Sequence, residues 1–208
     1  VGRHDEIDEL DRLLHGGERH GVLLSGPVGI GKTRLARVCA ERARHAGMSV
    51  IHVSGHSTAE QIPLGALAHL LPAEVLQTDT SSGELARTIV FQRARAALIS
   101  AGGGERLVVV VDHAEHLDEL SSALIGSLTS SGDVFAVLTQ RTSGREPLAF
   151  DELIRNGQIA HLELGPLSDT DLDVLLYRVL AGPIDLDSLQ QLTTLSRGRP
   201  GALQQLVE

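Results

Sequence analysis

The sequence predicts an α/β fold in which helices flank a parallel β-sheet, followed by a small all-helical unit. Three observations predict it. Short apolar runs alternate with segments of helical spacing over the first three quarters of the chain. A glycine-rich segment, residues 26–33, lies between a predicted strand and a predicted helix. After Leu164 the strand signal ends and only helical patterns follow.

Five apolar runs are predicted strands: residues 22–24, 49–53, 107–111, 134–138 and 159–164. The run Leu107 to Val111 is apolar without alternation, which is typical of a central strand covered by helices on both faces. Helical spacing predicts helices over residues 7–14, 32–46, 84–99, 117–128 and 148–154, with one short helix at 64–71. This alternation predicts βαβ units around a parallel sheet.

A boundary is predicted near residue 165, where Gly165-Pro166 breaks the chain. Ser168 and Asp171 resemble a capping box that begins a helix over 169–180. Two further helices are predicted near 186–195 and 201–207. We therefore expect an α/β domain over 1–165 and a helical unit over 166–208. Because the last residue falls inside a helical pattern, we expect the unit to be cut from a longer chain.

The strongest functional signal is the segment GPVGIGKT, residues 26–33, which matches the phosphate-loop pattern G-x-x-x-x-G-K-[ST]. Glycines allow a tight turn that directs backbone N–H groups and a helix N-terminus at phosphate. Among 18 basic residues Lys32 is the sole lysine, so a compact ammonium is indicated there. The residues expected to bind ATP or ADP here are Pro27, Val28, Gly29, Ile30, Gly31, Lys32, Thr33 and Arg34.

The apolar run LVVVV ends in Asp112, about 80 residues after the phosphate loop. An acid at this place is the usual second half of a phosphate-loop site. We expect Thr33 and Asp112 to hold Mg²⁺, because hydroxyl and carboxylate oxygens are its preferred ligands.

The residues after Asp112 leave the rate of ATP hydrolysis in question. A second acid commonly follows the first in such ATPases, whereas this chain has His113. An imidazole can accept a proton near neutral pH, and Glu115 could turn inward instead. We expect slow hydrolysis, with Lys32, Asp112, His113 and Glu115 as candidate catalytic residues.

A further candidate follows the predicted strand 134–138, where the chain continues Thr139-Gln140-Arg141. Arg141 could supply positive charge to phosphate in its own or a neighbouring subunit. An ordinary loop is the alternative.

Composition excludes several classes of protein. The formal net charge is −9, and the aromatic residues are three Phe and one Tyr, with no Trp. A chain that binds nucleic acid by itself is therefore excluded, because such binding needs a basic surface or stacked aromatic side chains. The single cysteine, Cys39, excludes an internal disulfide and indicates a reducing, cytoplasmic setting. No apolar run is long enough for a membrane helix, so we expect no membrane partner.

Together these motifs resemble the AAA+ and STAND signal-transduction ATPases. VGRHDEIDEL is similar to their opening motif, GPVGIGKT to their phosphate loop, VVVVDHAEHLD to their acidic strand and VLTQR to the strand with a trailing Arg. LELGPLSDTDLDVLL and SRGRPGALQQL resemble their lid. Among them the chain most resembles the large ATP-binding regulators of the LuxR type. It departs from the pattern at His4, where Glu is usual, and at His113.

The resemblance implies a P-loop NTPase sheet of strand order 5-1-4-3-2 with a helical lid over 166–208. It implies that Gly2 and Arg3 lie by the adenine and ribose, and that Pro200 contacts the base. It further implies a nucleotide switch in a transcription activator that self-associates and binds DNA through a region outside this chain. A small-molecule kinase, a scaffold without turnover and an initiator-like AAA+ module remain alternatives.

Overall fold

The computed structural model describes residues 2–77, 83–142, 148–180 and 185–207. Its sheet has five parallel strands in the order β2-β3-β4-β1-β5, the predicted order read from the other edge. The predicted fold class is therefore confirmed. The strands are β1 (Gly21–Gly26), β2 (Ser49–Ser54), β3 (Leu107–Asp112), β4 (Val134–Arg141) and β5 (Ile159–Glu163).

Helices connect the strands and follow them. The described helices are α1 (His4–Gly16), α2 (Lys32–His45), η1 (Gly65–Leu70), α3 (Ala73–Leu76), α4 (Glu84–Ala101), η3 (Ala114–His116), α5 (Glu119–Ser130), α6 (Leu148–Arg155), α7 (Asp169–Leu180), α8 (Leu186–Ser196) and α9 (Pro200–Val207). The helix predicted over 64–71 is the 3₁₀ helix η1. The start of α5 lies two residues later than predicted, because Asp118 caps it by accepting the N–H of Ser121 at 2.9 Å.

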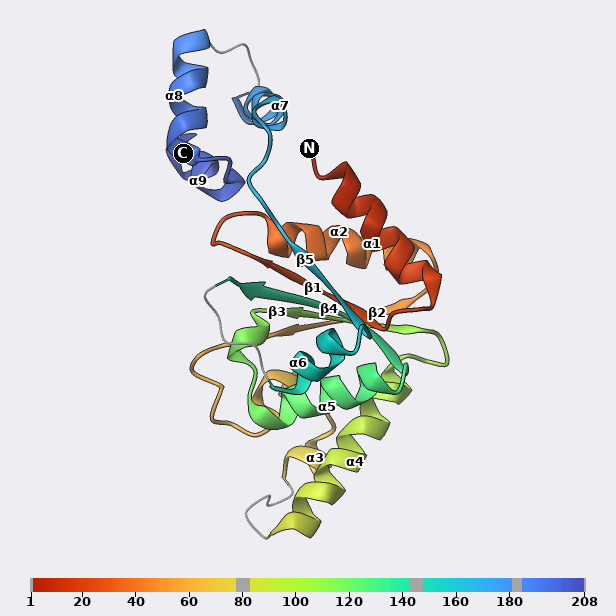
Figure 1. Cartoon of the computed structure of the whole chain (residues 1–208). Coiled ribbons are helices and arrows are strands. Elements are labelled where there is room, and N and C mark those ends of the chain that lie inside the picture. Colours follow the sequence, from red (N-terminus) through yellow and green to blue (C-terminus); the bar gives the residue numbers. More distant parts are fainter. Residues whose placement is uncertain (1, 78–82, 143–147, 181–184, 208) are drawn as a thin grey trace.

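The strands divide their side chains between two cores. Val22, Val108 and Val137 pack with α1 and α2, whereas Leu23 and Val109 pack with α4, α5 and α6. Alternation along a strand sends neighbours to opposite faces, so helices on both faces bury the central strands β1, β3 and β4, whereas the edge strands β2 and β5 stay partly exposed. Figure 1 shows these layers, with α7, α8 and α9 beyond one end of the sheet.

The helical unit has its own apolar cluster, formed by Leu167, Leu172, Leu176 and Leu203. At the start of α7 the Ser168 hydroxyl accepts the N–H of Asp171 at 3.1 Å, as the capping-box pattern predicts. The unit is tied together where Leu167 N–H donates to the Gly198 carbonyl at 2.8 Å. We refer to α7–α9 as the lid; the domain boundary at 165 stays a prediction.

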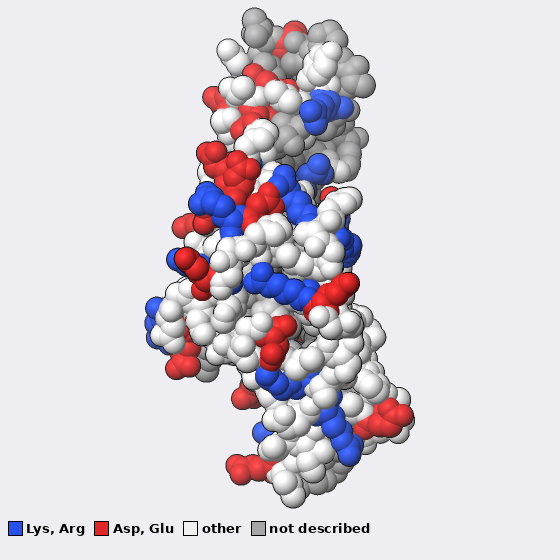
Figure 2. Space-filling view, turned by 90° about the vertical axis from the view of Figure 1, so that its right-hand side faces the viewer, with Lys and Arg blue, Asp and Glu red and all other residues white. Residues whose placement is uncertain are grey.

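Charges of both signs alternate on the surface. On the face that Figure 2 presents, Lys and Arg side chains stand among Asp and Glu rather than in one continuous field. No helix in the described ranges combines the length and the apolar character that a membrane crossing requires.

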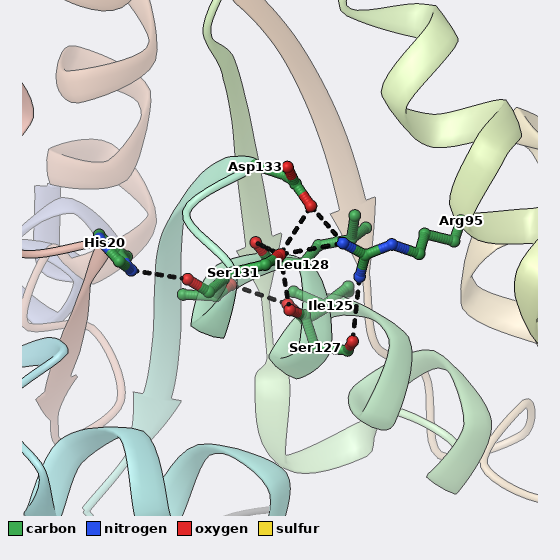
Figure 3. A network of polar contacts seen from close by, with 8 residues as sticks. His20, Arg95, Ile125, Ser127, Leu128, Ser131 and Asp133 are labelled. Atoms are coloured by element: carbon green, nitrogen blue, oxygen red, sulfur yellow. Dashed lines mark hydrogen bonds and ion pairs between the residues drawn. The ribbon is translucent and has the colours of Figure 1, made fainter.

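A polar network ties helices to the sheet at the end away from the phosphate loop (Figure 3). Arg95 of α4 donates to the hydroxyls of Ser127 and Ser131, each at 3.1 Å, and contacts the Asp133 carboxylate. His20 bonds to the Thr129 carbonyl at 2.9 Å. These contacts hold α4 against α5 and against the turn that leads into β4.

Candidate nucleotide site

The segment 26–33 forms a loop that joins β1 to α2 at the carboxyl end of the sheet. Gly29 and Gly31 adopt φ of 78° and 106°, conformations that a side chain strongly disfavours. These turns bring the loop to the N-terminus of α2, where backbone N–H groups and the helix dipole favour an anion. The local sequence therefore builds a phosphate cradle.

The side chain of Lys32 is buried in this loop. Its Nζ donates to the carbonyls of Gly26 at 2.7 Å and Pro27 at 3.0 Å. The pKa of the Lys32 amine is lowered from its usual 10.5, mainly by burial and to a lesser extent by the positive charge of Arg141. The negative charges of Glu115 and Asp112 act in the opposite direction and raise the pKa. The amine is thus held by two main-chain carbonyls of the loop, contacts that an incoming phosphate can replace.

Thr33 and Asp112 meet beside the loop. The Thr33 hydroxyl donates to Asp112 Oδ1 at 3.0 Å, and the Thr139 hydroxyl contacts the same oxygen. These hard oxygen ligands suit Mg²⁺. Among the described residues, no group of three or more His, Cys, Asp or Glu side chains forms a metal site. A magnesium ion here would therefore complete its shell with phosphate and water oxygens, which is its usual binding mode.

A cavity of about 820 Å³ opens between the phosphate loop and the lid. This volume lies within the range of small-molecule sites. The phosphate-loop side, the strand ends and the lid all contribute to its lining: Val28, Gly29, Gly31, Lys32, Thr33, Arg34, His113, Arg141, Leu175, Pro200, Gly201, Leu203 and Gln204. One side of the cavity is polar and positive, and the lid side presents apolar Leu175, Pro200 and Leu203.

Most predicted site residues meet at this cavity, and the others lie around it. Asp112 lines a second cavity of about 310 Å³, which shares Thr33 with the first. Ile30 is fully buried beneath the loop, and Val28 is largely exposed to the cavity. Gly2 and Arg3 are outside the described lining, at the junction with the lid.

Arg3 joins three segments. Its guanidinium donates to the carbonyls of Ile30 at 3.1 Å and Gly165 at 2.6 Å, and to Glu6 at 2.7 Å. Its side chain is only 11% exposed. The position predicted to lie by adenine and ribose therefore holds the phosphate loop to the start of the lid; its contact with nucleotide stays a prediction.

The candidate catalytic residues lie on neighbouring segments. His113 has φ of 56°, and its N–H donates to the Thr139 hydroxyl at 3.1 Å. Arg141 is the last residue of β4, so it lies at the strand end rather than in the following loop. Glu115 lies in η3, with Oε1 at 3.6 Å from both His113 Nδ1 and Arg141 Nε.

Sequence reasoning missed some residues of this site. Thr139 is buried and contacts Asp112; a polar residue ending a strand beside the phosphate loop indicates a group that could sense phosphate or position water, but not this contact. Leu175 and Leu203 line the cavity from the lid. Their helical spacing indicates packing alone, so no sequence signal distinguishes them from core leucines.

Comparison with known proteins identifies the family. The AAA ATPase domain model matches residues 1–139. The chain is 32% identical over 214 residues to the Holliday junction branch migration complex subunit RuvB of Salinispora arenicola, covering 96% of the chain and 53% of the relative. It is 31% identical over 195 residues to the ATP-dependent zinc metalloprotease FtsH 3 of Sorangium cellulosum, covering 92% and 30% respectively. The chain spans about half the length of its RuvB relative.

Solved structures share the fold at lower identity. The Aeropyrum pernix ORC1 protein in complex with DNA gives a TM-score of 0.63 at 19% identity, covering 99% of this chain and 59% of that one. AMPPCP-bound DnaA from Aquifex aeolicus gives a TM-score of 0.59 at 14% identity, and the match covers 98% of this chain and 60% of that one. The fold, the phosphate loop and the match of the family model lead to one conclusion. The chain belongs to the AAA ATPase domain family.

Proposed function

We propose that this domain is an ATP- and ADP-binding switch that depends on Mg²⁺, hydrolyses ATP slowly and sits within a larger LuxR-type transcriptional regulator. The proposal of a switch rests on one observation: the cavity of about 820 Å³ has the phosphate loop on one side and lid residues on the other. A nucleotide that contacts both would set the position of the lid, so different ligands would favour different states.

Each side of the cavity suits one part of a nucleotide. Lys32 and the N–H groups of the loop suit phosphate, and apolar Leu175, Pro200 and Leu203 suit a base. Thr33 and Asp112 would hold Mg²⁺, which would neutralise phosphate charge when bound. The domain boundary at 165, with the lid beyond it, is part of the same proposal.

Slow hydrolysis follows from the residues beside Asp112. His113 lines the cavity in the place where a second acid is common, so an imidazole rather than a carboxylate would orient the attacking water. Arg141 lines the same cavity and would place positive charge near the terminal phosphate. A slow reaction would let the ATP state persist long enough to act as a signal.

Titration calorimetry of ATP and ADP tests the proposal, with single-turnover hydrolysis measured on the same samples. We expect both nucleotides to bind the native chain with Mg²⁺, Lys32→Ala to abolish binding, and hydrolysis to be slower than typical turnover of roughly 10 per second. Binding that survives Lys32→Ala unchanged, or fast hydrolysis, would contradict the switch. A helix-turn-helix following residue 208 in the full protein would support the LuxR-type role.

A second candidate is a module of an initiator- or RuvB-like assembly that acts on DNA. The 32% identity to a branch migration subunit favours it. Two observations favour the first proposal, in which this domain does not bind DNA itself: the net charge is −9, and charges of both signs are interspersed on the face in Figure 2. Binding to the phosphate backbone of DNA requires a basic surface. ATP-dependent ring assembly together with salt-sensitive DNA binding by this domain alone would favour the second candidate.

A further inference from the structure

Glu115 is a buried carboxylate whose hydrogen bonds are unmet. Its side chain is 5% exposed. Within the described part of the chain, neither carboxylate oxygen has a hydrogen-bond partner. Buried charges are normally paired, because water no longer compensates for the loss of hydration. The position of Glu115 therefore calls for a cationic or hydrogen-donating group close by.

Two such groups lie within ion-pair distance of it, and both line the cavity; the Lys32 amine, which the Glu115 charge also affects, lies beyond that distance. Arg141 Nε and His113 Nδ1 each lie 3.6 Å from Glu115 Oε1. These distances are too long for a hydrogen bond but lie within ion-pair range. Glu115 itself is absent from the described lining of the cavity, so it reaches the cavity through these neighbours.

We propose that Glu115 is a positioning residue that holds Arg141 by its Nε and directs the terminal nitrogens of the guanidinium at the terminal phosphate of ATP. The inference rests on the proposed function and assigns Glu115 a role other than that of the acid acting on water. A guanidinium held through Nε keeps both terminal nitrogens as donors, in the fork geometry that suits phosphate.

Contact with Glu115 would restrict the conformation of Arg141 more than that of His113. The Arg141 side chain is long, 46% exposed and always charged, so a free guanidinium would sample many rotamers. His113 has a short side chain on a backbone that the Thr139 hydroxyl already fixes. The buried Glu115 carboxylate therefore restrains the side chain of Arg141 more than that of His113.

Two substitutions at Glu115 separate its charge from its shape. Glu115→Gln keeps one oxygen acceptor for Arg141 Nε, whereas Glu115→Met removes both acceptors at similar length. We expect the preference for ATP over ADP to fall by about tenfold in Glu115→Met and less in Glu115→Gln, because Arg141 would no longer be held for its charge-assisted hydrogen bond to the terminal phosphate. ADP affinity should stay within about twofold of the native value, because ADP lacks the phosphate that Arg141 would contact.

Glu60→Gln is the matched control. Glu60 contacts His116, one residue beyond Glu115, and lines a different cavity. This substitution should leave the ATP-to-ADP preference unchanged.

A double-mutant cycle with Arg141→Met tests the pairing itself. If Glu115 acts through Arg141, the preference for ATP in the double variant equals that of Arg141→Met alone. Additive losses, or an unchanged preference in Glu115→Met, would overturn the inference while nucleotide binding remained intact.

A measurement without nucleotide separates this inference from the proposed function. Without nucleotide, the Arg141 Nε–H should exchange with solvent more slowly in the native chain than in Glu115→Met, because the ion pair with Glu115 restrains the guanidinium. Equal exchange in the two proteins would overturn the pairing. A native chain that bound neither nucleotide would overturn both the proposed function and the role of Arg141.

Discussion

The backbone N–H of Gly201, in the first turn of α9, donates a hydrogen bond to the carbonyl oxygen of Gly29 in the phosphate loop, at 2.9 Å. This bond joins the lid directly to the loop at the edge of the cavity of about 820 Å³, where we propose that nucleotide binds. The approach is close because Gly201 has no side chain: a Cβ there would lie 2.8 Å from Gly29 Cα.

Gly201→Ala should separate the lid from the phosphate loop. The added methyl group meets backbone rather than a flexible side chain, so the lid must shift. We expect nucleotide affinity to fall by about tenfold, equivalent to ~1.4 kcal/mol, as measured by calorimetry. Gly16→Ala is the control, because no described atom lies within 4 Å of its added Cβ. Equal affinities for the two variants would show that the contact does not matter for binding.

Asp112→Asn and Thr33→Val should remove the magnesium dependence of ATP binding. Both side chains belong to one hydrogen-bonded pair of oxygen ligands. The ratio of ATP affinity with Mg²⁺ to that with a chelator should fall by about tenfold in each variant, with Mg²⁺-free binding nearly retained. Asp133→Asn changes a carboxylate at the other end of the sheet and should keep the native ratio. A native ratio in Asp112→Asn would refute this metal site.

Arg3→Ala should destabilise the native state even without nucleotide. It removes charged hydrogen bonds to two carbonyls and one carboxylate from a largely buried side chain. We expect a loss of about 2 kcal/mol in the free energy of unfolding, measured with urea. Arg12→Ala, whose partner Glu9 lies on the same exposed helix face, should cost under about 0.5 kcal/mol. Similar losses would mean that Arg3 is not a structural clamp.

Cys39 should be chemically silent in the native state. Burial raises the pKa of its thiol to about 12 from a usual value of 9.0. Thiol reagents require the thiolate, so labelling near pH 8 should follow unfolding rather than direct attack. Rapid labelling of the fully native protein would contradict this burial.

The same shift predicts a pH dependence of stability. Above pH 9.0 the unfolded chain loses the thiol proton while the folded chain keeps it up to about 12. The unfolded state then binds fewer protons, so the free energy of unfolding falls as pH rises through this window. The slope should be less steep in Cys39→Ala, by at most about 1.4 kcal/mol per pH unit. Identical slopes in the two proteins would contradict the shift.

Most of the fold could be predicted because its signals are local. Each strand is a short apolar run, and the phosphate loop needs particular residue types at consecutive positions. The order of the strands came from resemblance and is confirmed by the pairing of β1 with both β4 and β5.

The site was harder to predict from the sequence than the fold, because it depends on contacts between distant segments. Nothing in the sequence around Arg3 indicates that it bonds to Ile30 and Gly165, which lie far along the chain. Glu115 was a candidate that could turn inward, and its side chain is buried, but the described lining of the cavity includes its neighbours His113 and Arg141 rather than Glu115 itself. Such arrangements follow from packing of the loops, which local patterns do not specify.

Thermal unfolding with and without saturating Mg²⁺ and ATP provides the decisive comparison for nucleotide binding at Lys32. Ligand at about 100 times its dissociation constant stabilises the folded state by ~2.7 kcal/mol, which raises the unfolding midpoint by roughly 5 °C or more in a domain of this size. We predict that shift in the native chain and in Arg12→Ala, and its loss in both Lys32→Ala and Lys32→Arg. A native chain without the shift, or Lys32→Ala with all of it, would contradict a nucleotide site at the phosphate loop.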